Sequence, residues 1–388
     1  SWLDARKKND FRVMERDLDI LIGLKREESQ ILGFENHPYD PHLNEYDKGA
    51  TVTFIDSVFH TLQHDLKTFM DSYPWQNQPA SPFAGRRFAK DKQWELGMEL
   101  LKTMGFDFNS GRQDVSEHPF TISFHPGDVR LTTRIDETDF SSMVWTCIHE
   151  GGHGLYEQGL PKEQYGLPLG EACSFSIHES QSRLWENCLG RSRAFCDYLL
   201  EKLQCYFPGS VDDIDPDQFY RYVNRVEPSL IRTEADEVTY HFHVIIRYEL
   251  EKKLIEGSLK TTEIPEFWNQ AYKQWLGLDV PDDNRGCLQD VHWSHGSFGY
   301  FPTYTLGSLY AVHFFSAFEK EHPGWASLAG QGDFIDLKNW LSDKVFRWGK
   351  FYNSLELCNI CSGEPFQMNQ FPNYLAKKFK SITSNVYE

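Results

Sequence analysis

The chain has 388 residues, 40% of them hydrophobic and 15% aromatic, which is typical of a globular protein with a sizeable buried core. Acidic residues (57) outnumber basic ones (39) and give a formal net charge of −18, so we expect no nucleic-acid partner. We expect no membrane span, because no apolar run reaches about 18 residues, and no signal peptide in the polar start SWLDARKKND.

Helical periodicity covers most of the chain. The first predicted helix carries one apolar stripe, formed by Phe11, Met14, Leu18, Ile22 and Leu24. Three further segments are also predicted to be helical: residues 218–257, with an interruption near Pro228, residues 335–347 and residues 371–379. No repeat or linker divides the sequence, so we predict a mainly α fold and a single domain over residues 1–388.

Residues 118–136 differ from this pattern. Phe120, Ile122 and Phe124 alternate with polar residues, and a Pro-Gly-Asp turn at 126–128 leads into a second alternating run. The segment predicts a β-hairpin, or two adjacent strands, directly before the most informative motif of the chain.

That motif is HEGGH, residues 149–153. His149 and His153 are one helical turn apart, about 6 Å, which suits two imidazoles on one Zn²⁺. Glu150 lies beside them and can act as a general base towards a metal-activated water. Asp139 or Ser141 can cap the start of this helix, and a Gly-x-Pro sequence at 159–161 ends it.

The same helix contains three glycines, Gly151, Gly152 and Gly154. Each costs about 1 kcal/mol relative to alanine inside a helix. We interpret them as space for a strand, a metal and a substrate, because a missing Cβ permits close approach.

A hydrolytic metal site needs a third protein ligand. The pattern HExxHxxGxxH is absent, so this ligand must come from farther along the chain. Glu163, Glu171 and Glu179 are the carboxylate candidates, and His178 is a further one. Residues 170–189 are predicted to be helical, so Glu171 and Glu179 could both face the first helix, and spacing does not choose between them.

The eight cysteines follow no disulfide framework, which predicts free thiols in a reducing, cytoplasmic compartment. CNIC, residues 358–361, is a lone CxxC, and we expect no metal or redox role for it.

Several short motifs occur in one order along the chain: HPF (118–120), DVRLT (128–132), HEGGH (149–153), HESQS (178–182), IRTEAD (231–236), GCLQDVHW (286–293) and GYFPTYTLG (299–307). With these motifs the chain resembles the Taq-type metallocarboxypeptidases, the M32 family of zinc peptidases. Nearly the whole chain is covered by this resemblance.

The resemblance implies a mainly α, saddle-like homodimer with a deep groove and a small β-sheet beside the HExxH helix. It implies a single catalytic domain that lacks the family's N-terminal helices. It assigns His149, His153 and Glu179 as ligands of Zn²⁺, with Co²⁺ as an alternative metal. It assigns Glu150 as the general base, and it implies broad removal of C-terminal residues from peptides.

A carboxypeptidase must bind the free C-terminal carboxylate of its substrate, for which a guanidinium is best suited. Four arginines lie near motif residues: Arg130, Arg134, Arg183 and Arg232. The resemblance favours Arg232, which we expect on a helix, with an ion pair to Glu234 or Asp236 as the alternative. Arg130 could bind substrate or pair with Asp128 or Asp136.

The remaining candidate residues concern the oxyanion and the substrate backbone. Tyr300, Tyr304 and His295 are candidate donors to the oxyanion. The 118–136 strands could bind the substrate backbone as an added strand, with His118 touching the substrate or orienting the strand.

Two other function classes remain open at this point. One is a zinc endopeptidase or aminopeptidase, and the other is an inactive zinc-binding scaffold. The intact Glu150 argues against the scaffold.

Overall fold

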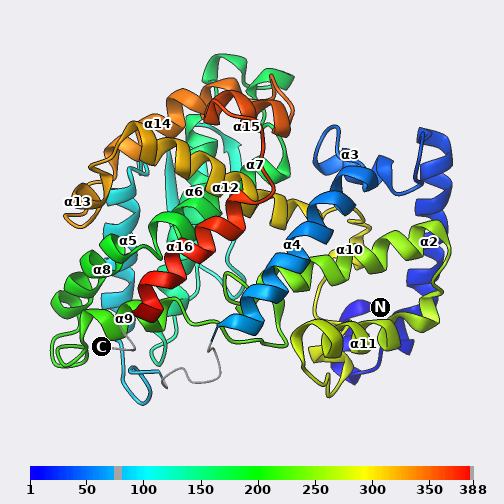
Figure 1. Cartoon of the computed structure of the whole chain (residues 1–388), viewed down its shortest axis with the longest axis horizontal. Helices are drawn as coiled ribbons and strands as arrows, with labels where there is room; N and C mark the ends of the chain where they lie inside the picture. The colour runs from blue at the N-terminus through cyan, green and yellow to red at the C-terminus, as the bar shows by residue number, and fades with distance from the viewer. Residues whose placement is uncertain (74–80, 385–388) are drawn as a thin grey trace. The chain divides into compact units, whose positions relative to one another are not determined.

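The computed structural model describes residues 1–73 and 81–384 (Figure 1). The chain divides into two compact units, one formed by residues 1–77 and 225–306, the other by residues 78–224 and 307–388. We call them the first and the second unit. Both contain residues from two separate stretches of the sequence.

The first unit consists of helices. They are α1 (Trp2–Lys8), α2 (Arg12–Leu32), α3 (Asp40–Tyr46), α4 (Val52–Ser72), α10 (Tyr240–Glu256) and α11 (Ile264–Leu276). The apolar stripe of α2 is buried as expected at Met14, Leu18 and Ile22. The inclusion of Leu24 was wrong, because two residues beyond Ile22 the helix has turned by about 200° and Leu24 is exposed. Most residues of α10 are buried, because it packs against α2, α4 and α11.

The predicted interruption of the helix in residues 218–257 is confirmed, but it is longer than the break that a single proline causes. Helix α9 (Pro216–Val223) ends well before Pro228, and only the short 3₁₀ turn Arg232–Glu234 precedes α10. Asp236 accepts hydrogen bonds from the backbone N–H groups of Val238 and Thr239, at 2.8 and 2.9 Å. These bonds fix the backbone directly before α10 begins.

The second unit contains a three-stranded sheet, formed by β1 (Gly111–Val115), β2 (Thr121–His125) and β3 (Asp128–Thr133) in the order β1-β3-β2. Strands β2 and β3 are antiparallel, which confirms the predicted hairpin. Strand β1 pairs with β3 in parallel and was not predicted, because its sequence GRQDV lacks apolar alternation.

Helix α6 (Phe140–Gly159) packs against this sheet, against α5 (Lys90–Met104) and against α7 (Phe175–Arg183), as Figure 1 shows. Asp139 caps its start by accepting a hydrogen bond from Ser141 N–H, and the helix ends at Gly159, as predicted.

The glycines of α6 make room for neighbouring elements. A Cβ on Gly154 would lie 2.8 Å from Leu131 of β3, which confirms the expected approach of a strand. A Cβ on Gly152 would lie 2.7 Å from the backbone oxygen of Gln181, and one on Gly151 would lie 2.7 Å from Leu101. These two glycines therefore allow close packing of α7 and α5 and do not face a metal or substrate.

The other helices of the second unit are α8 (Arg193–Tyr206), α9, α13 (Trp325–Ala329), α14 (Ile335–Lys344), α15 (Ser354–Ser362) and α16 (Gln370–Ser384), with a π-helical segment at Leu184–Leu189. Helix α12 (Pro302–Glu321) contributes residues to both units. Helix α16 confirms the helical prediction for 371–379. Helix α14 confirms the prediction for 335–347 as far as Lys344, and the 3₁₀ turn Phe346–Trp348 follows it.

The mainly α fold with a small sheet beside the HExxH helix is thus confirmed. The single catalytic domain and the deep groove stay predictions. In the part of the chain that the structure describes, no helix combines the length and the apolar character needed to cross a membrane.

Candidate metal centre

Helix α6 brings the two histidines of the HEGGH motif together. The rings of His149 and His153 have centroids 5.0 Å apart, as expected for residues one turn apart. Nε2 of His153 lies 3.5 Å from Oε2 of Glu179 on α7. One ligand atom from each of these three side chains lies within 4.8 Å of the other two. The three residues therefore form a candidate metal centre.

Of the carboxylates that the sequence left open, only Glu179 joins this cluster. Ser174 caps α7 by accepting from Ile177 N–H, so the helix begins at Phe175 and not near residue 170 as expected. Glu171 precedes the helix, is exposed, and pairs with Lys350 at 2.8 Å. Glu163 lies exposed in the 3₁₀ turn Lys162–Gln164.

Hydrogen bonds to Nδ1 orient both imidazoles of the candidate metal centre. Nδ1 of His149 lies 2.8 Å from Oε2 of Glu186, which makes this nitrogen a donor. Nδ1 of His153 lies 2.6 Å from Nδ1 of His178, whose Nε2 lies 2.7 Å from Oε1 of Glu157. If His178 donates through Nε2, its Nδ1 accepts from His153. Both ligand histidines then keep Nε2 unprotonated for a metal.

Arg183 balances the negative charge of the cluster. Its Nε donates to Oε1 of Glu179 at 2.7 Å, and its Nη1 donates to Oε2 of Glu186 at 3.3 Å. Burial opposes ionisation of both glutamates, but Arg183 and the neighbouring histidines outweigh it and hold both pKa values well below their usual range. Glu179 is therefore a carboxylate, as a metal ligand must be.

The donor set fits a divalent metal. Two imidazole nitrogens and one carboxylate oxygen are the protein ligands of many hydrolytic zinc sites, and three ligands leave a position for water or substrate. Gly307 of α12 permits this arrangement, because a Cβ there would lie 2.7 Å from Cβ and Cγ of Glu179. This glycine is the last residue of the motif GYFPTYTLG.

Glu150 is buried beside the cluster. The hydroxyl of Thr121 on β2 donates to its Oε2 at 2.5 Å and lies 3.2 Å from its backbone oxygen. Thr121 was not among the residues expected from the sequence. Its only signal was its place directly after the motif HPF.

Two candidate substrate-binding residues lie at the sheet. Arg130 is exposed and pairs with Asp128 through two bonds of 2.9 Å, which is the alternative considered for it. His118 is exposed just before β2. Arg183 is occupied by the metal cluster, as described above, and Arg134 is exposed.

Arg232 belongs to the first unit and is buried. It lies in a short 3₁₀ turn, so the expected helix is wrong, and its partner is neither Glu234 nor Asp236. Its Nε and Nη2 donate to Oδ1 of Asp290, at 3.0 and 2.8 Å, and its Nη1 donates to the hydroxyl of Tyr240 at 3.1 Å.

The motifs IRTEAD, GCLQDVHW and GYFPTYTLG meet around Arg232. Its guanidinium lies over the Tyr304 ring, 4.8 Å from the centroid, and the Tyr304 hydroxyl lies 3.1 Å from Nε2 of His292. Burial, aided by the charges of Arg232 and Arg247, lowers the pKa of His292 to about 3, so this imidazole is neutral.

Tyr300 lies beside this group. Its ring centroid is 5.2 Å from that of Tyr304. His295 is exposed, and its Nδ1 lies 2.9 Å from Oγ of Ser297.

Other polar clusters have simpler explanations. Among the described residues, Asp56, His60 and Glu249 of the first unit also bring three possible ligand atoms within 4.8 Å of one another. The ammonium of Lys252, however, lies 2.7 Å from Asp56 and 2.9 Å from Glu249 and supplies the counter-charge. These residues are therefore explained as an ion-pair cluster.

Seven of the eight cysteines are buried thiols, and Cys205 is exposed. The described chain contains no disulfide bond. Cys358 and Cys361 of the CNIC sequence are buried, and burial raises the pKa of Cys361 to about 12, which makes it a poor nucleophile and metal ligand.

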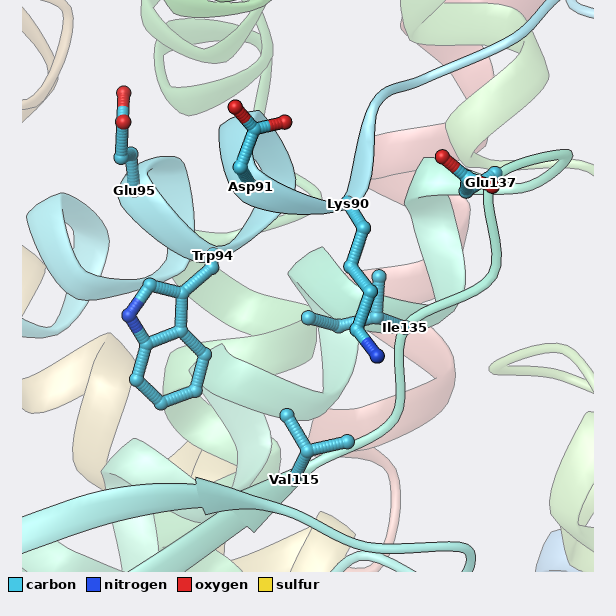
Figure 2. Close-up of a pocket in the computed structure, with 7 residues that line it drawn as sticks. All are labelled: Lys90, Asp91, Trp94, Glu95, Val115, Ile135 and Glu137. Atoms are coloured by element: carbon cyan, nitrogen blue, oxygen red, sulfur yellow. The ribbon is translucent and has the colours of Figure 1, made fainter.

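A pocket of about 530 Å³ lies in the second unit, between the start of α5 and the end of β1 (Figure 2). Lys90, Trp94, Val115 and Ile135 line it, together with three acidic residues. It contains none of the candidate metal ligands and none of the substrate-binding candidates.

Two histidines one helical turn apart, a glutamate beside the first and a carboxylate from a following helix define the class of HExxH metal-dependent hydrolases. The sequence model of the family "Carboxypeptidase Taq (M32) metallopeptidase" matches residues 1–379. The chain therefore belongs to this family.

Individual relatives agree. The chain is 37% identical to "Carboxypeptidase 1" of Bacillus subtilis (strain 168), over 98% of this chain and 76% of that protein. It is similar to the solved "Crystal structure of M32 carboxypeptidase from Deinococcus radiodurans R1", with 38% identity and a TM-score of 0.95 over 98% of this chain and 77% of that one. "The Structure of CHT" matches with 52% identity and a TM-score of 0.94 at the same coverage.

The chain is accordingly a metal-dependent carboxypeptidase, a peptide hydrolase. The endopeptidase, the aminopeptidase and the inactive scaffold are not favoured. Its substrates are peptides.

Proposed function

We propose that the chain is a zinc carboxypeptidase of broad specificity, with its metal held by His149, His153 and Glu179. The observation that carries this proposal is the donor cluster, in which three ligand atoms lie within 4.8 Å of one another. The hydrogen bonds that Nδ1 of His149 donates to Glu186 and Nδ1 of His153 donates to His178 support it.

A divalent metal in such a site supplies Lewis-acid chemistry, making water a nucleophile at neutral pH and polarising a carbonyl. Glu150 is proposed as the general base, which takes a proton from the attacking water and delivers it to the leaving amine. Its support is its position next to His149 in a buried environment. Its hydrogen bond with Thr121 further restricts the orientation of its carboxylate.

Arg232 is proposed to bind the C-terminal carboxylate of the substrate. The described contacts of its guanidinium use three of five N–H groups, through Asp290 and Tyr240. These contacts fix the orientation of the planar cation, and a fixed guanidinium recognises a carboxylate with geometric specificity.

The other proposed substrate contacts concern the oxyanion and the substrate backbone. Tyr300 or Tyr304 is proposed to donate to the oxyanion; when the neutral His292 donates through Nε2 to the Tyr304 hydroxyl, 3.1 Å away, that hydroxyl keeps its own proton for the oxyanion. His118 and Arg130 flank the exposed strand β2 and are proposed to touch the substrate backbone or orient the strand that binds it.

Zinc is proposed because it favours mixed nitrogen and oxygen donors, and Co²⁺ accepts the same ligands. A cytoplasmic homodimer is also proposed, the compartment on the basis of the thiols and the dimer on the basis of the family resemblance. The absence of a disulfide among the described residues fits a reducing compartment.

Peptides with free and amidated C-termini test this function. The metal-loaded protein should release the C-terminal residue of an N-blocked peptide, and amidation should strongly reduce this release and leave only residual cleavage. Equal cleavage of both peptides would indicate an endopeptidase, and release of N-terminal residues would indicate an aminopeptidase.

The Glu150→Gln variant tests the base. It should bind metal like the wild type and lose at least about 100-fold in kcat, since an amide does not accept the proton. Glu163→Gln, an exposed acid on a nearby turn, is the matched control and should remain active. Near-normal turnover of Glu150→Gln with bound metal would contradict the assignment.

A further inference from the structure

The edge strand β2 contacts Glu150 through one hydroxyl group. Oγ1 of Thr121 lies 2.5 Å from Oε2 of Glu150 and 3.2 Å from its backbone oxygen. Both residues belong to the second unit. The bond uses one carboxylate oxygen, Oε2.

The backbone of the same threonine points in another direction. The backbone oxygen of Phe120 accepts from Thr132 N–H of β3 at 3.0 Å, and Ile122 is opposite Arg130 in the register. Backbone groups of successive residues in an antiparallel strand alternate in direction. The N–H and C=O of Thr121 therefore point away from β3, towards the outer edge of the sheet.

The side chains of β2 alternate in the same way. Thr121 faces α6, where Glu150 lies, whereas Ile122 and Phe124 lie on the other face and are 42% and 54% exposed. Thr121 is thus the residue of β2 whose backbone faces the open edge and whose side chain contacts the candidate base.

We propose that Thr121 is a positioning residue that couples docking of the substrate backbone on β2 to the orientation of Glu150. The inference rests on the proposed function, in which a peptide adds to β2 and Glu150 is the base. A docked peptide exchanges main-chain hydrogen bonds with Thr121 and fixes its backbone. The hydroxyl then holds Oε2 in place, and Oε1 stays directed at the attacking water.

The coupling has a kinetic signature. Peptides long enough to pair with β2 restrain Thr121, and peptides too short to reach it do not. The value of kcat therefore rises with peptide length, and the rise depends on the hydroxyl. A hydroxyl that only satisfied a buried polar atom would alter stability and leave the length dependence of kcat unchanged.

The test compares an N-blocked dipeptide with an N-blocked pentapeptide on the zinc-loaded wild type, Thr121→Val and Thr121→Ser. Valine keeps the shape of threonine and removes the hydroxyl. The expected result is a loss of about tenfold or more in kcat on the pentapeptide, the scale of one hydrogen bond to a charged group, with KM little changed. Serine should restore most of kcat.

Thr133→Val is the matched control. Thr133 is buried on the neighbouring strand β3, and its hydroxyl lies 3.5 Å from the backbone oxygen of Met143 in α6, away from Glu150. This variant should keep the wild-type length dependence. A second readout is calorimetric binding of the pentapeptide to the metal-free proteins, which Thr121→Val should leave unchanged.

The proposal is overturned if Thr121→Val keeps the wild-type kcat on both peptides, if serine restores nothing, or if the loss lies in KM and in peptide binding alone. These outcomes differ from failure of the proposed function. If Glu150→Gln retains activity, the general-base assignment fails, whereas an inactive Glu150→Gln with an unaffected Thr121→Val overturns only the role of Thr121.

Discussion

Nδ1 of His153 lies 2.6 Å from Nδ1 of His178. Two nitrogens at this distance share one proton, so one ring donates and the other accepts. Glu157, 2.7 Å from Nε2 of His178, favours a proton on that nitrogen and leaves Nδ1 of His178 as the acceptor. The unprotonated nitrogen of His153 is then Nε2, the atom that faces Glu179.

Replacing His178 should therefore weaken metal binding. His178→Phe keeps a ring of similar size and removes the acceptor, so we expect the metal affinity to fall about 10- to 100-fold. Competition between the protein and a chromophoric chelator for Zn²⁺ measures this. His322→Phe, a partly exposed histidine of the same unit, is the control. An unchanged Kd for zinc in His178→Phe would show that His178 does not orient His153.

A paired substitution tests the third ligand. Glu179→Gln removes the anionic donor of the cluster and should abolish stoichiometric zinc binding at micromolar concentrations. Glu171→Gln breaks only an exposed ion pair with Lys350 and should bind zinc like the wild type. Metal analysis after dialysis compares the two. Zinc retained by Glu179→Gln and lost by Glu171→Gln would reverse the assignment.

Local patterns predicted much of the metal centre. The spacing of His149 and His153 fixes their relation within one helix, and alternation of apolar residues identified β2 and β3. Ser174 also carried a usable signal, because a serine before a helical run is a common N-cap. It would have excluded Glu171 from the helix.

Partners distant in the sequence could not be predicted. Asp290 pairs with Arg232 across 58 residues, and Thr121 contacts Glu150 across 29. Such contacts depend on how the elements pack, and single-sequence periodicity does not report packing. Strand β1 was missed for a related reason, since its polar residues form a strand only through parallel pairing with β3.

Gly307 should be needed to seat the third ligand. A Cβ there would lie 2.7 Å from Cβ and Cγ of Glu179, closer than van der Waals contact permits, so Gly307→Ala should displace the carboxylate. We expect weaker zinc binding, measured with the same chelator, and a lower melting temperature.

Gly324→Ala is its control, because a Cβ at Gly324 meets no heavy atom within 4 Å. This variant should match the wild type in both measurements. If Gly307→Ala also matched the wild type, α12 would be able to move away from Glu179 at no measurable cost.

Glu251 should make stability depend on pH. Its buried carboxylate accepts hydrogen bonds from the hydroxyl of Tyr39, from Nε1 of Trp293 at 2.7 Å and from Gly299 N–H at 2.8 Å. Burial nevertheless raises its pKa from 4.5 to about 7. A raised pKa in the folded state means that the folded protein binds the proton more tightly than the unfolded chain does.

The contribution of Glu251 is therefore complete below pH 4.5 and lost as the pH rises to about 7. The free energy of unfolding should fall by on the order of 3 kcal/mol over this range because of this group. Urea unfolding at several pH values measures it, and Glu251→Gln should remove this part of the slope. Parallel pH profiles for variant and wild type would contradict the raised pKa.

Arg232 should determine whether the enzyme requires a free C-terminus. Its guanidinium is buried, and its hydrogen bonds to Asp290 fix its orientation. A substrate carboxylate would therefore meet a cation that is already oriented and shielded from water. Arg232→Ala should lower kcat/KM for peptides with free C-termini. The loss should correspond to an increase of roughly 2–5 kcal/mol in activation free energy. Residual cleavage of amidated peptides, which lack the partner charge, should change much less.

The control must separate substrate recognition from folding. The alanine variant removes one of the two cations beside the buried Asp290 and leaves only Arg247, whose Nε lies 2.7 Å from Oδ2 of Asp290. Arg232→Lys keeps a positive charge beside Asp290 but loses the planar fork, so it should fold like the wild type and recover only part of the activity. Zinc binding and the melting temperature of each variant are measured first. Equal losses on free and amidated peptides would make Arg232 a structural residue. Arg130 would then be the next candidate, because its ion pair with Asp128 is exposed and a substrate carboxylate could replace Asp128 at little cost.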